Sequence, residues 1–455
     1  MPSQAKTLYW RPNAATLALA AIALTLPCVV FFSRHFVKLR LGPFYALEVV
    51  ALLWAVALIT RGKSEVLGFL KSALRERGAI PKLALFFFAI GMARLVLDLP
   101  FSRDVALSMA LVLQHCLVFV YPLTWILIGL WTASQRAQML PCAAAAMVAV
   151  SIPSYLFFSY SDLATDPLMT GLGANYAIGP LAAALAAWLF ATRKISTAYR
   201  FAGGTLAAIA AFFPYWRMLH THIQRSSFVL LFVMIFATPW LVLKGRRLKA
   251  LSVSSLLVAL FAAGTFVSLG SNVSDRAFES LRHYDDHYQP EKDEPGKEIA
   301  GFRFKSRAFW WKTAVEDWKT APVFGVGLLK NVPSMILPGV TNDGNFKHYS
   351  DLASLGGKPI AGPHNSYLGI LARFGLVGLA AFLALAFAAT RAIAKFARET
   401  DFDRERPLES LLELLTVLIP VNGMLYAFMG IGFESPHNSV LLWFFAGVLL
   451  KKSYK

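Results

Sequence analysis

The chain alternates between long apolar runs and short polar connections. The apolar runs mostly continue for about 17 residues or more, which is the length of a membrane-spanning helix. They lack the two-residue alternation of a membrane β-barrel strand. Twelve helical spans are predicted, at roughly 14–33, 41–59, 82–99, 105–131, 142–159, 174–191, 201–216, 226–243, 250–269, 366–390, 410–429 and 438–450.

One polar interval is much longer than the others and divides the chain into three parts. Residues 1–269 hold spans one to nine, residues 270–365 form an extramembrane domain, and residues 366–455 hold the last three spans. Within the polar domain, the spacing of aromatic and apolar residues predicts an amphipathic helix at 306–320, capped by Ser306. A glycine-rich turn at 322–327 is expected to end that helix.

Composition supports the membrane assignment. Hydrophobic residues make up 57% of the chain and charged residues 15%, and the mean hydropathy is +0.55. A soluble domain carries about 25% charged residues. The fold class expected is therefore an all-α polytopic membrane protein, with one mainly helical domain outside the membrane.

The net charge of +18 arises from the connections between spans. Basic residues cluster at 61–82, 244–249 and 391–406, whereas the opposite short loops hold only Arg34, Lys38, Arg40, Arg103, Arg217 and Arg225. Cytoplasmic loops are enriched in Lys and Arg. Both termini are therefore expected in the cytoplasm and residues 270–365 on the far side, the periplasm of a bacterium. That segment has equal numbers of acidic and basic residues, which argues against a nucleic-acid surface.

Cofactor signatures are missing from the sequence. The three cysteines, Cys28, Cys116 and Cys142, all lie in apolar segments without metal-ligand spacing. Metalloprotease HExxH, P-loop and GxGxxG motifs do not occur. No metal, nucleotide or other cofactor is predicted.

His364 is the first candidate for chemistry, because it lies where the polar domain meets the tenth span. A histidine can accept a proton from a hydroxyl near neutral pH. Asn365 is a suitable N-cap for the following helix, and it would hold His364 just outside the helix end. The alternative is a histidine at the lipid headgroups without a catalytic role.

Three arginines on the same predicted face are candidates for binding an anion. Arg217 and Arg225 share a short loop with His220 and His222. Arg307 lies in the first turn of the amphipathic helix, where a bound anion would meet both the guanidinium and the helix N-terminus. Each arginine could instead extend toward the membrane surface or into water without a ligand.

Several charged residues fall within predicted spans or repeat the His364 pattern. Arg94 and Asp98 are four apart on one helix and are expected to pair. Arg373 lies about 13 Å along its helix from His364 and must face protein or a wet crevice. Glu48 and Glu413 are less specific candidates of the same kind. The second Pro-His-Asn-Ser sequence contains His437, which with Glu434 could form an alternative acid/base pair.

The chain resembles the O-antigen ligase and polymerase superfamily of bacterial envelope glycosyltransferases. The ligase hallmark is His, then Asn, Ser or Gln, nine residues, Gly, two residues, then Gly, Thr or Tyr, and His364, Asn365, Gly375 and Gly378 match it. The copy at His437 fails, because Val448 stands where the glycine is required. Arg225 in QRSS is similar to the family's arginine signature, and Arg307, Trp310 and the Pro-x-x-Gly-x-Gly sequence at 322–327 are similar to a second one.

This resemblance implies a GT-C-like fold of about twelve helices and a metal-independent, inverting transfer of a glycan. The donor would be undecaprenyl-pyrophosphate-linked O-antigen, and the acceptor lipid A–core at the periplasmic face of the inner membrane. His364 would act as the base or orient the acceptor. Arg225, Arg307 and Arg217 would bind pyrophosphate, with Asn365, Gly375 and Gly378 in support.

Alternative functions remain open at this point. Within the superfamily they are an O-antigen polymerase and a protein O-oligosaccharyltransferase, although the latter usually has additional C-terminal sequence. From another class, a non-enzymatic transporter of polyprenol-linked glycans would suit a polytopic chain. Transporters, however, place charged groups near the membrane midplane, whereas these candidates lie on one face.

Overall fold

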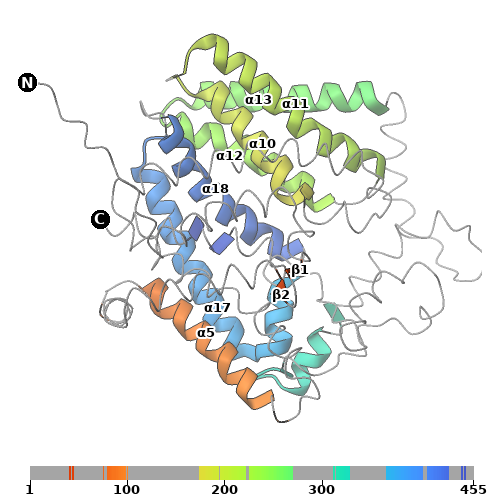
Figure 1. The fold of residues 1–455 in the computed structure, drawn as a ribbon, viewed down its shortest axis with the longest axis vertical. Coiled ribbons are helices and arrows are strands. Elements are labelled where there is room, and N and C mark those ends of the chain that lie inside the picture. The colour runs from red at the N-terminus through yellow and green to blue at the C-terminus, as the bar shows by residue number, and fades with distance from the viewer. Residues whose placement is uncertain are drawn as a thin grey trace, which may run out of the picture.

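The fold of the chain was obtained as a computed structural model. It describes residues 40–41, 44–45, 75, 79–98, 100, 174–193, 195–221, 225–269, 311–312, 314–327, 365–402, 407–429, 442–443 and 445–446. The helices in these residues are α5 (Ala79–Asp98), α10 (Ala174–Ala191), α11 (Thr197–Thr221), α12 (Arg225–Val242), α13 (Arg247–Leu269), α17 (Ser366–Glu399) and α18 (Pro407–Met429) (Figure 1). Residues 311–312, 314–320, 442–443 and 445–446 are also helical.

The helices coincide with predicted spans. The span predicted at 174–191 has the bounds of α10, and α12 and α18 begin within a few residues of the predicted positions. In the described part, three helices are long and apolar enough to cross a bilayer, over Arg247–Gly264, Ser366–Glu399 and Glu409–Phe428. The spans predicted at 14–33, 105–131 and 142–159 lie outside the described residues, so the total of twelve stays a prediction.

The predicted start of the second span is wrong. Arg40–Leu41 (β1) and Phe44–Tyr45 (β2) pair as a two-residue antiparallel hairpin, whereas a helix was expected from residue 41. The intervening sequence is Gly42-Pro43. Proline disfavours helical backbone in the residue before it and lacks an N–H donor, so this dipeptide favours a turn.

The described helices form two groups that α18 joins. Helices α10, α11, α12 and α13 pack together, and α5 lies along α17 (Figure 1). Helix α18 contacts α12 from the first group and α17 from the second. Alanines on α10 allow its neighbours to approach closely, as small residues do in membrane helix packing. The buried ones are Ala182, Ala183, Ala184, Ala186, Ala187 and Ala191.

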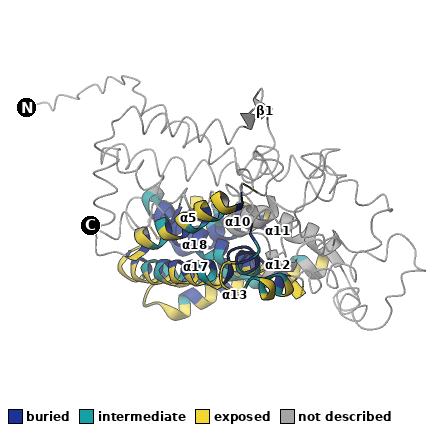
Figure 2. Cartoon of the chain, turned by 90° about the horizontal axis from the view of Figure 1, so that it is seen from below, coloured by how far each residue is buried: buried dark blue, intermediate teal, exposed yellow. Residues whose placement is uncertain are grey.

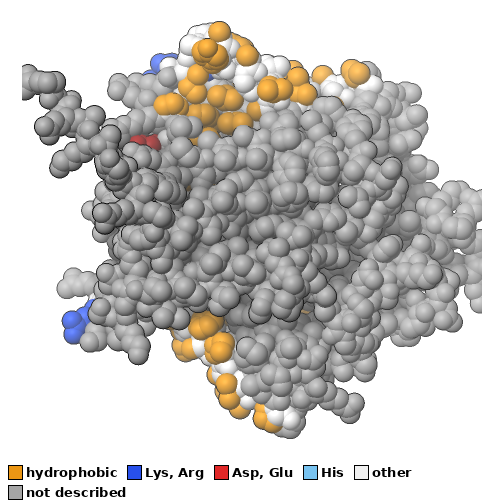
Figure 3. Space-filling view, in the orientation of Figure 1, with side chains coloured by type: hydrophobic (Ala, Val, Ile, Leu, Met, Phe, Trp, Pro, Cys, Tyr) orange, Lys and Arg blue, Asp and Glu red, His pale blue; other side chains and the backbone are white. Residues whose placement is uncertain are grey.

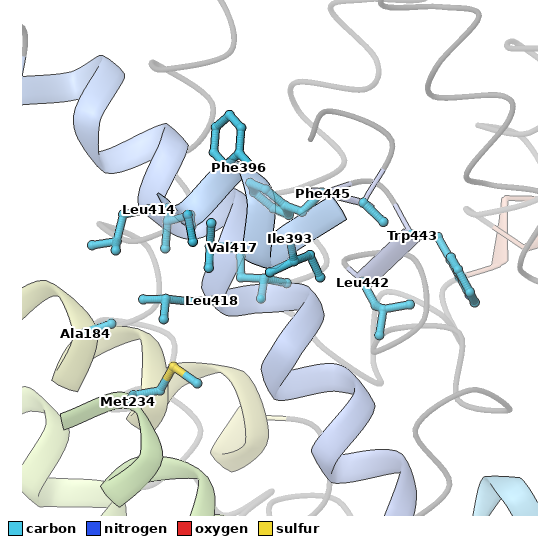
Figure 4. Close-up of a cluster of buried hydrophobic side chains, with 14 of the residues drawn as sticks. Ala184, Met234, Ile393, Phe396, Leu414, Val417, Leu418, Leu442, Trp443 and Phe445 are labelled. Carbon is cyan, nitrogen blue, oxygen red and sulfur yellow. The ribbon is translucent and has the colours of Figure 1, made fainter. Parts of the chain in front are cut away.

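The largest apolar cluster is centred on α18. Side chains from α10, α12, α17 and the helical residues near 445 converge on it (Figure 4). The labelled members are Ala184, Met234, Ile393, Phe396, Leu414, Val417, Leu418, Leu442, Trp443 and Phe445. Figure 2 shows the contrast between this buried helix and the exposed outer side of α13.

Large apolar side chains cover the outward faces of several helices. Examples on α11 and α13 are Leu206, Ile209, Leu251, Leu256 and Leu260. Hydrophobic side chains also dominate the described surface in the space-filling view (Figure 3). Extensive exposed apolar surface on continuous apolar helices is suited to lipid contact. The protein is therefore a membrane protein.

Lys244 connects the two helix groups at one end. It lies in the short turn between α12 and α13, and its Nζ donates hydrogen bonds to the carbonyl oxygens of Arg398 (2.7 Å) and Thr400 (2.6 Å). These carbonyls belong to the C-terminal end of α17, where a cation also complements the helix dipole. Burial lowers the pKa of the Lys244 ammonium, and the nearby Asp401 carboxylate partly opposes this shift.

Replacing Lys244 with Met should lower the free energy of unfolding by about 1 kcal/mol, because two hydrogen bonds to helix-end carbonyls are lost. Thermal unfolding in nanodiscs, followed by tryptophan fluorescence, measures the change. Lys395→Met is the matched control, since Lys395 pairs only with Glu399 at 4.0 Å on an exposed surface, among the interactions described for it. Exposed pairs contribute little. Equal destabilisation by both substitutions would contradict the assigned role of Lys244.

Candidate functional site

Helix α17 begins with a side-chain cap. Asn365 has extended backbone angles (φ −153°, ψ 106°), and its Oδ1 accepts hydrogen bonds from the N–H groups of Tyr367 (3.0 Å) and Leu368 (3.1 Å). The cap satisfies donors that an α-helix leaves unpaired at its start. The predicted N-cap is confirmed. His364 precedes Asn365 in the sequence but lies outside the described residues.

Helix α17 is broken at Gly375. This residue has φ 66° and ψ −163°, a combination that essentially only glycine adopts. The break separates a short helix at 366–374 from a long one at 376–399. The long part extends about 36 Å at 1.5 Å per residue, enough to cross a bilayer core of about 30 Å by itself. The predicted continuous span from residue 366 missed this break.

The turn at 321–327 fills the break in α17. The sequence predicted a turn here at the end of a helix, and the structure confirms it. Four backbone hydrogen bonds join the turn to α17, two donated by each partner. From the turn, the N–H groups of Val326 and Gly327 donate to the carbonyl oxygens of Ala372 (2.8 Å) and Arg373 (3.1 Å). From α17, the N–H groups of Leu376 and Val377 donate to the carbonyl oxygens of Pro322 (2.9 Å) and Val323 (3.2 Å).

Two glycines allow this close approach. A Cβ on Gly325 would overlap the backbone of Arg373 and Gly375, and a Cβ on Gly375 would overlap the backbone of Val323 and Gly325. Each glycine therefore occupies space that a side chain on the other would need. We call the turn 321–327 together with residues 372–377 the glycine interlock.

Helix α5 forms a third side of the interlock. Arg94 and Asp98 make a two-point ion pair, with Nε to Oδ2 at 3.1 Å and Nη2 to Oδ1 at 3.0 Å, as predicted from their spacing. A Cβ on Gly327 would overlap both side chains, so the pair lies directly against the turn. Phe87 of α5 packs edge-on against Phe374 before the break, with ring centroids 6.0 Å apart.

Arg373 lies in the short helix beside the break and is only 3% exposed. This confirms the prediction that it faces protein or a crevice. Its carbonyl oxygen belongs to the interlock, as described above. Glu413 on α18 is also buried, whereas Glu48 lies outside the described residues.

The remaining predicted site residues are only partly described. Arg217 falls within α11 and Arg225 is the first residue of α12, and these two helices are consecutive in the sequence. Arg307 lies outside the described residues, as do Glu434 and His437. Their common site therefore stays a prediction. Within the described part of the chain, no three His, Cys, Asp or Glu residues gather as a metal-binding group.

Sequence reasoning missed the interlock itself. The two glycine motifs were identified separately, some fifty positions apart, and their contact was not predicted. One signal for the contact was present in the sequence. Both motifs contain glycine, which lowers helix stability, and glycine at such a position often marks a close approach of two backbones.

Comparison with known proteins identifies the segment that contains the interlock. Residues 219–383 match the family described as O-antigen ligase. The matched segment includes Arg225, Arg307, His364, Asn365, Gly375 and Gly378 but begins just after Arg217. No curated protein matches the chain. The resemblance to the O-antigen ligase superfamily that the sequence motifs predicted is thus confirmed over residues 219–383.

Proposed function

We propose that the protein is an O-antigen ligase of the bacterial inner membrane. It would transfer O-antigen from undecaprenyl pyrophosphate to lipid A–core at the periplasmic face. The observation that carries the proposal is the complete ligase motif, from His364 to Gly378, within the family-matched segment. The capped helix start at Asn365 and the break at Gly375 give two of the motif residues a local structural role.

In the proposed reaction, His364 accepts the proton of an acceptor sugar hydroxyl. The hydroxyl oxygen attacks the anomeric carbon of the donor and forms the new glycosidic bond. The bond from that carbon to the phosphate oxygen breaks, and lipid pyrophosphate leaves with the electron pair. Attack opposite the leaving group inverts the anomeric configuration. A positioned base of this kind contributes about 10²–10⁴-fold to the rate.

The arginines would stabilise the leaving group. Guanidinium groups stay charged and bind phosphate oxygens in a two-point manner. Arg225 and Arg307 are assigned to the pyrophosphate, with Arg217 nearby in sequence. Negative charge grows on the pyrophosphate as it departs, so preformed cations lower the barrier. This arrangement requires no metal or cofactor.

The main alternative is an O-antigen polymerase, because the matched superfamily supports either activity. Deleting the gene and resolving lipopolysaccharide on a gel distinguishes the two. A ligase deletion leaves bare core and accumulates long glycan on the lipid carrier. A polymerase deletion leaves core that bears one repeat unit, and a transporter deletion stops glycan from reaching the periplasm.

Replacing His364 with Ala should reduce glycan transfer by about 10²–10⁴-fold, because the general base is lost. The measurement is transfer from purified lipid-linked donor to lipid A–core by the full-length protein in nanodiscs. His437→Ala is the matched control, since His437 lies in the same Pro-His-Asn-Ser sequence but outside the ligase motif. Normal transfer by His364→Ala would refute the assigned role.

Replacing Arg225 or Arg307 with Ala should slow transfer by about 10²–10³-fold, the usual loss for one donor that stabilises developing charge. Lysine at either position should restore only part of the rate, because it keeps the charge but not the two-point geometry. Arg103→Ala, on the same predicted face, serves as the control. Unchanged transfer and unchanged affinity for undecaprenyl pyrophosphate would remove that arginine from the site.

A further inference from the structure

We infer that the glycine interlock positions groups for the transfer reaction. This inference rests on the proposed function. It joins the helix that follows the predicted pyrophosphate ligand Arg307 in the sequence to the helix that follows the predicted base His364. Gly325, Gly327 and Gly375 are the positioning residues. The interlock holds the short helix of α17 in a fixed direction relative to the helix that ends at Thr320.

The two helices meet at the interlock. The helical residues 314–320 end directly before the turn, and the short helix 366–374 ends at the break. Both helices therefore reach the interlock with their C-terminal ends. Their N-terminal directions lead back along the sequence toward Arg307 in one case and His364 in the other.

The contact between the turn and α17 is rigid. Hydrogen bonds run in both directions between the turn and α17, on both sides of Gly375. The backbones touch without intervening side chains at Gly325 and Gly375, so rotamer changes cannot loosen the contact. The Arg94–Asp98 pair supports the turn from the side of α5. The turn 321–327, α17 and α5 thus together fix the angle between the helix that ends at Thr320 and the short helix of α17.

The length of the short helix amplifies any rotation at the interlock. The short helix extends about 12 Å from its cap to the interlock, at 1.5 Å per residue. A tilt of about 5° at the joint would move the capped end by about 1 Å. Misplacement by about 1 Å can cost roughly 100-fold in rate. The position of the capped helix end at Asn365 is therefore sensitive to small changes at the joint.

Two alanine variants test the inference in the full-length protein in nanodiscs. Gly327→Ala is the milder one, because its Cβ would meet side-chain ends of Arg94 and Asp98. Gly375→Ala is the stronger one, because its Cβ would meet backbone. Transfer at saturating donor should fall about 100-fold. Binding of undecaprenyl pyrophosphate without glycan should stay within about threefold, the pattern of an interaction needed only for the chemical step.

Gly245→Ala is the matched control. Gly245 also has a positive φ (76°), but nothing lies within 4 Å of its Cβ position. It therefore reproduces the positive φ of the substituted glycines without the collision. Transfer by this variant should equal that of the wild type, and its melting temperature reports the cost of the strain alone.

Three results would overturn the inference. The first is full-rate transfer by folded Gly327→Ala and Gly375→Ala. The second is a parallel loss of transfer and pyrophosphate binding that follows the loss of thermal stability, which a purely structural role would produce. The third is an equal loss of transfer by Gly245→Ala, which would assign the effect to a positive φ and not to the contact between the turn and α17.

These results are distinguishable from failure of the proposed function. If the wild-type protein transfers no glycan, or if His364→Ala transfers normally, the ligase mechanism fails. If the wild type is active and His364→Ala is inactive while the interlock variants transfer at full rate, only the positioning inference fails.

Discussion

The contact between the backbones of Gly325 and Gly375 is the constraint on which the structure around the break in α17 depends. An interrupted helix leaves amide and carbonyl groups without intrahelical partners, and in a membrane protein each such group costs several kcal/mol unless it is paired. The turn at 321–327 supplies those partners. It can reach them only because neither glycine carries a side chain. The break and the turn therefore stabilise each other.

The surrounding helices fit this interpretation. Helix α5 covers the interlock with its ion pair, and Phe87 contacts both Phe374 and Phe382, on opposite sides of the break. Farther along, α17 packs on α18 and is held at its C-terminal end by Lys244. The short and long parts of α17 thus share contacts with α5. The short part also contacts α18, through Tyr367.

The sequence predicted what depends on local pattern. Continuous apolar runs located the described helices, Asn365 was recognised as a cap, and the spacing of Arg94 and Asp98 indicated their pairing. The break at Gly375 could not be predicted in this way, because glycine is common within membrane helices and its backbone angles depend on a distant turn. The candidate arginines and His364 were identified by residue type and resemblance, which do not determine distances.

A joint made from backbone has a consequence for how the protein tolerates mutation. Pro322, Val323 and Val326 contribute carbonyl or amide groups, which most residue types can provide, and Val323 is half exposed. The glycines contribute the absence of a Cβ, which no other residue type can provide. Gly325 and Gly375 therefore mark the place where two chain segments leave room only for main chain, whereas a Cβ on Gly327 would meet the side chains of Arg94 and Asp98.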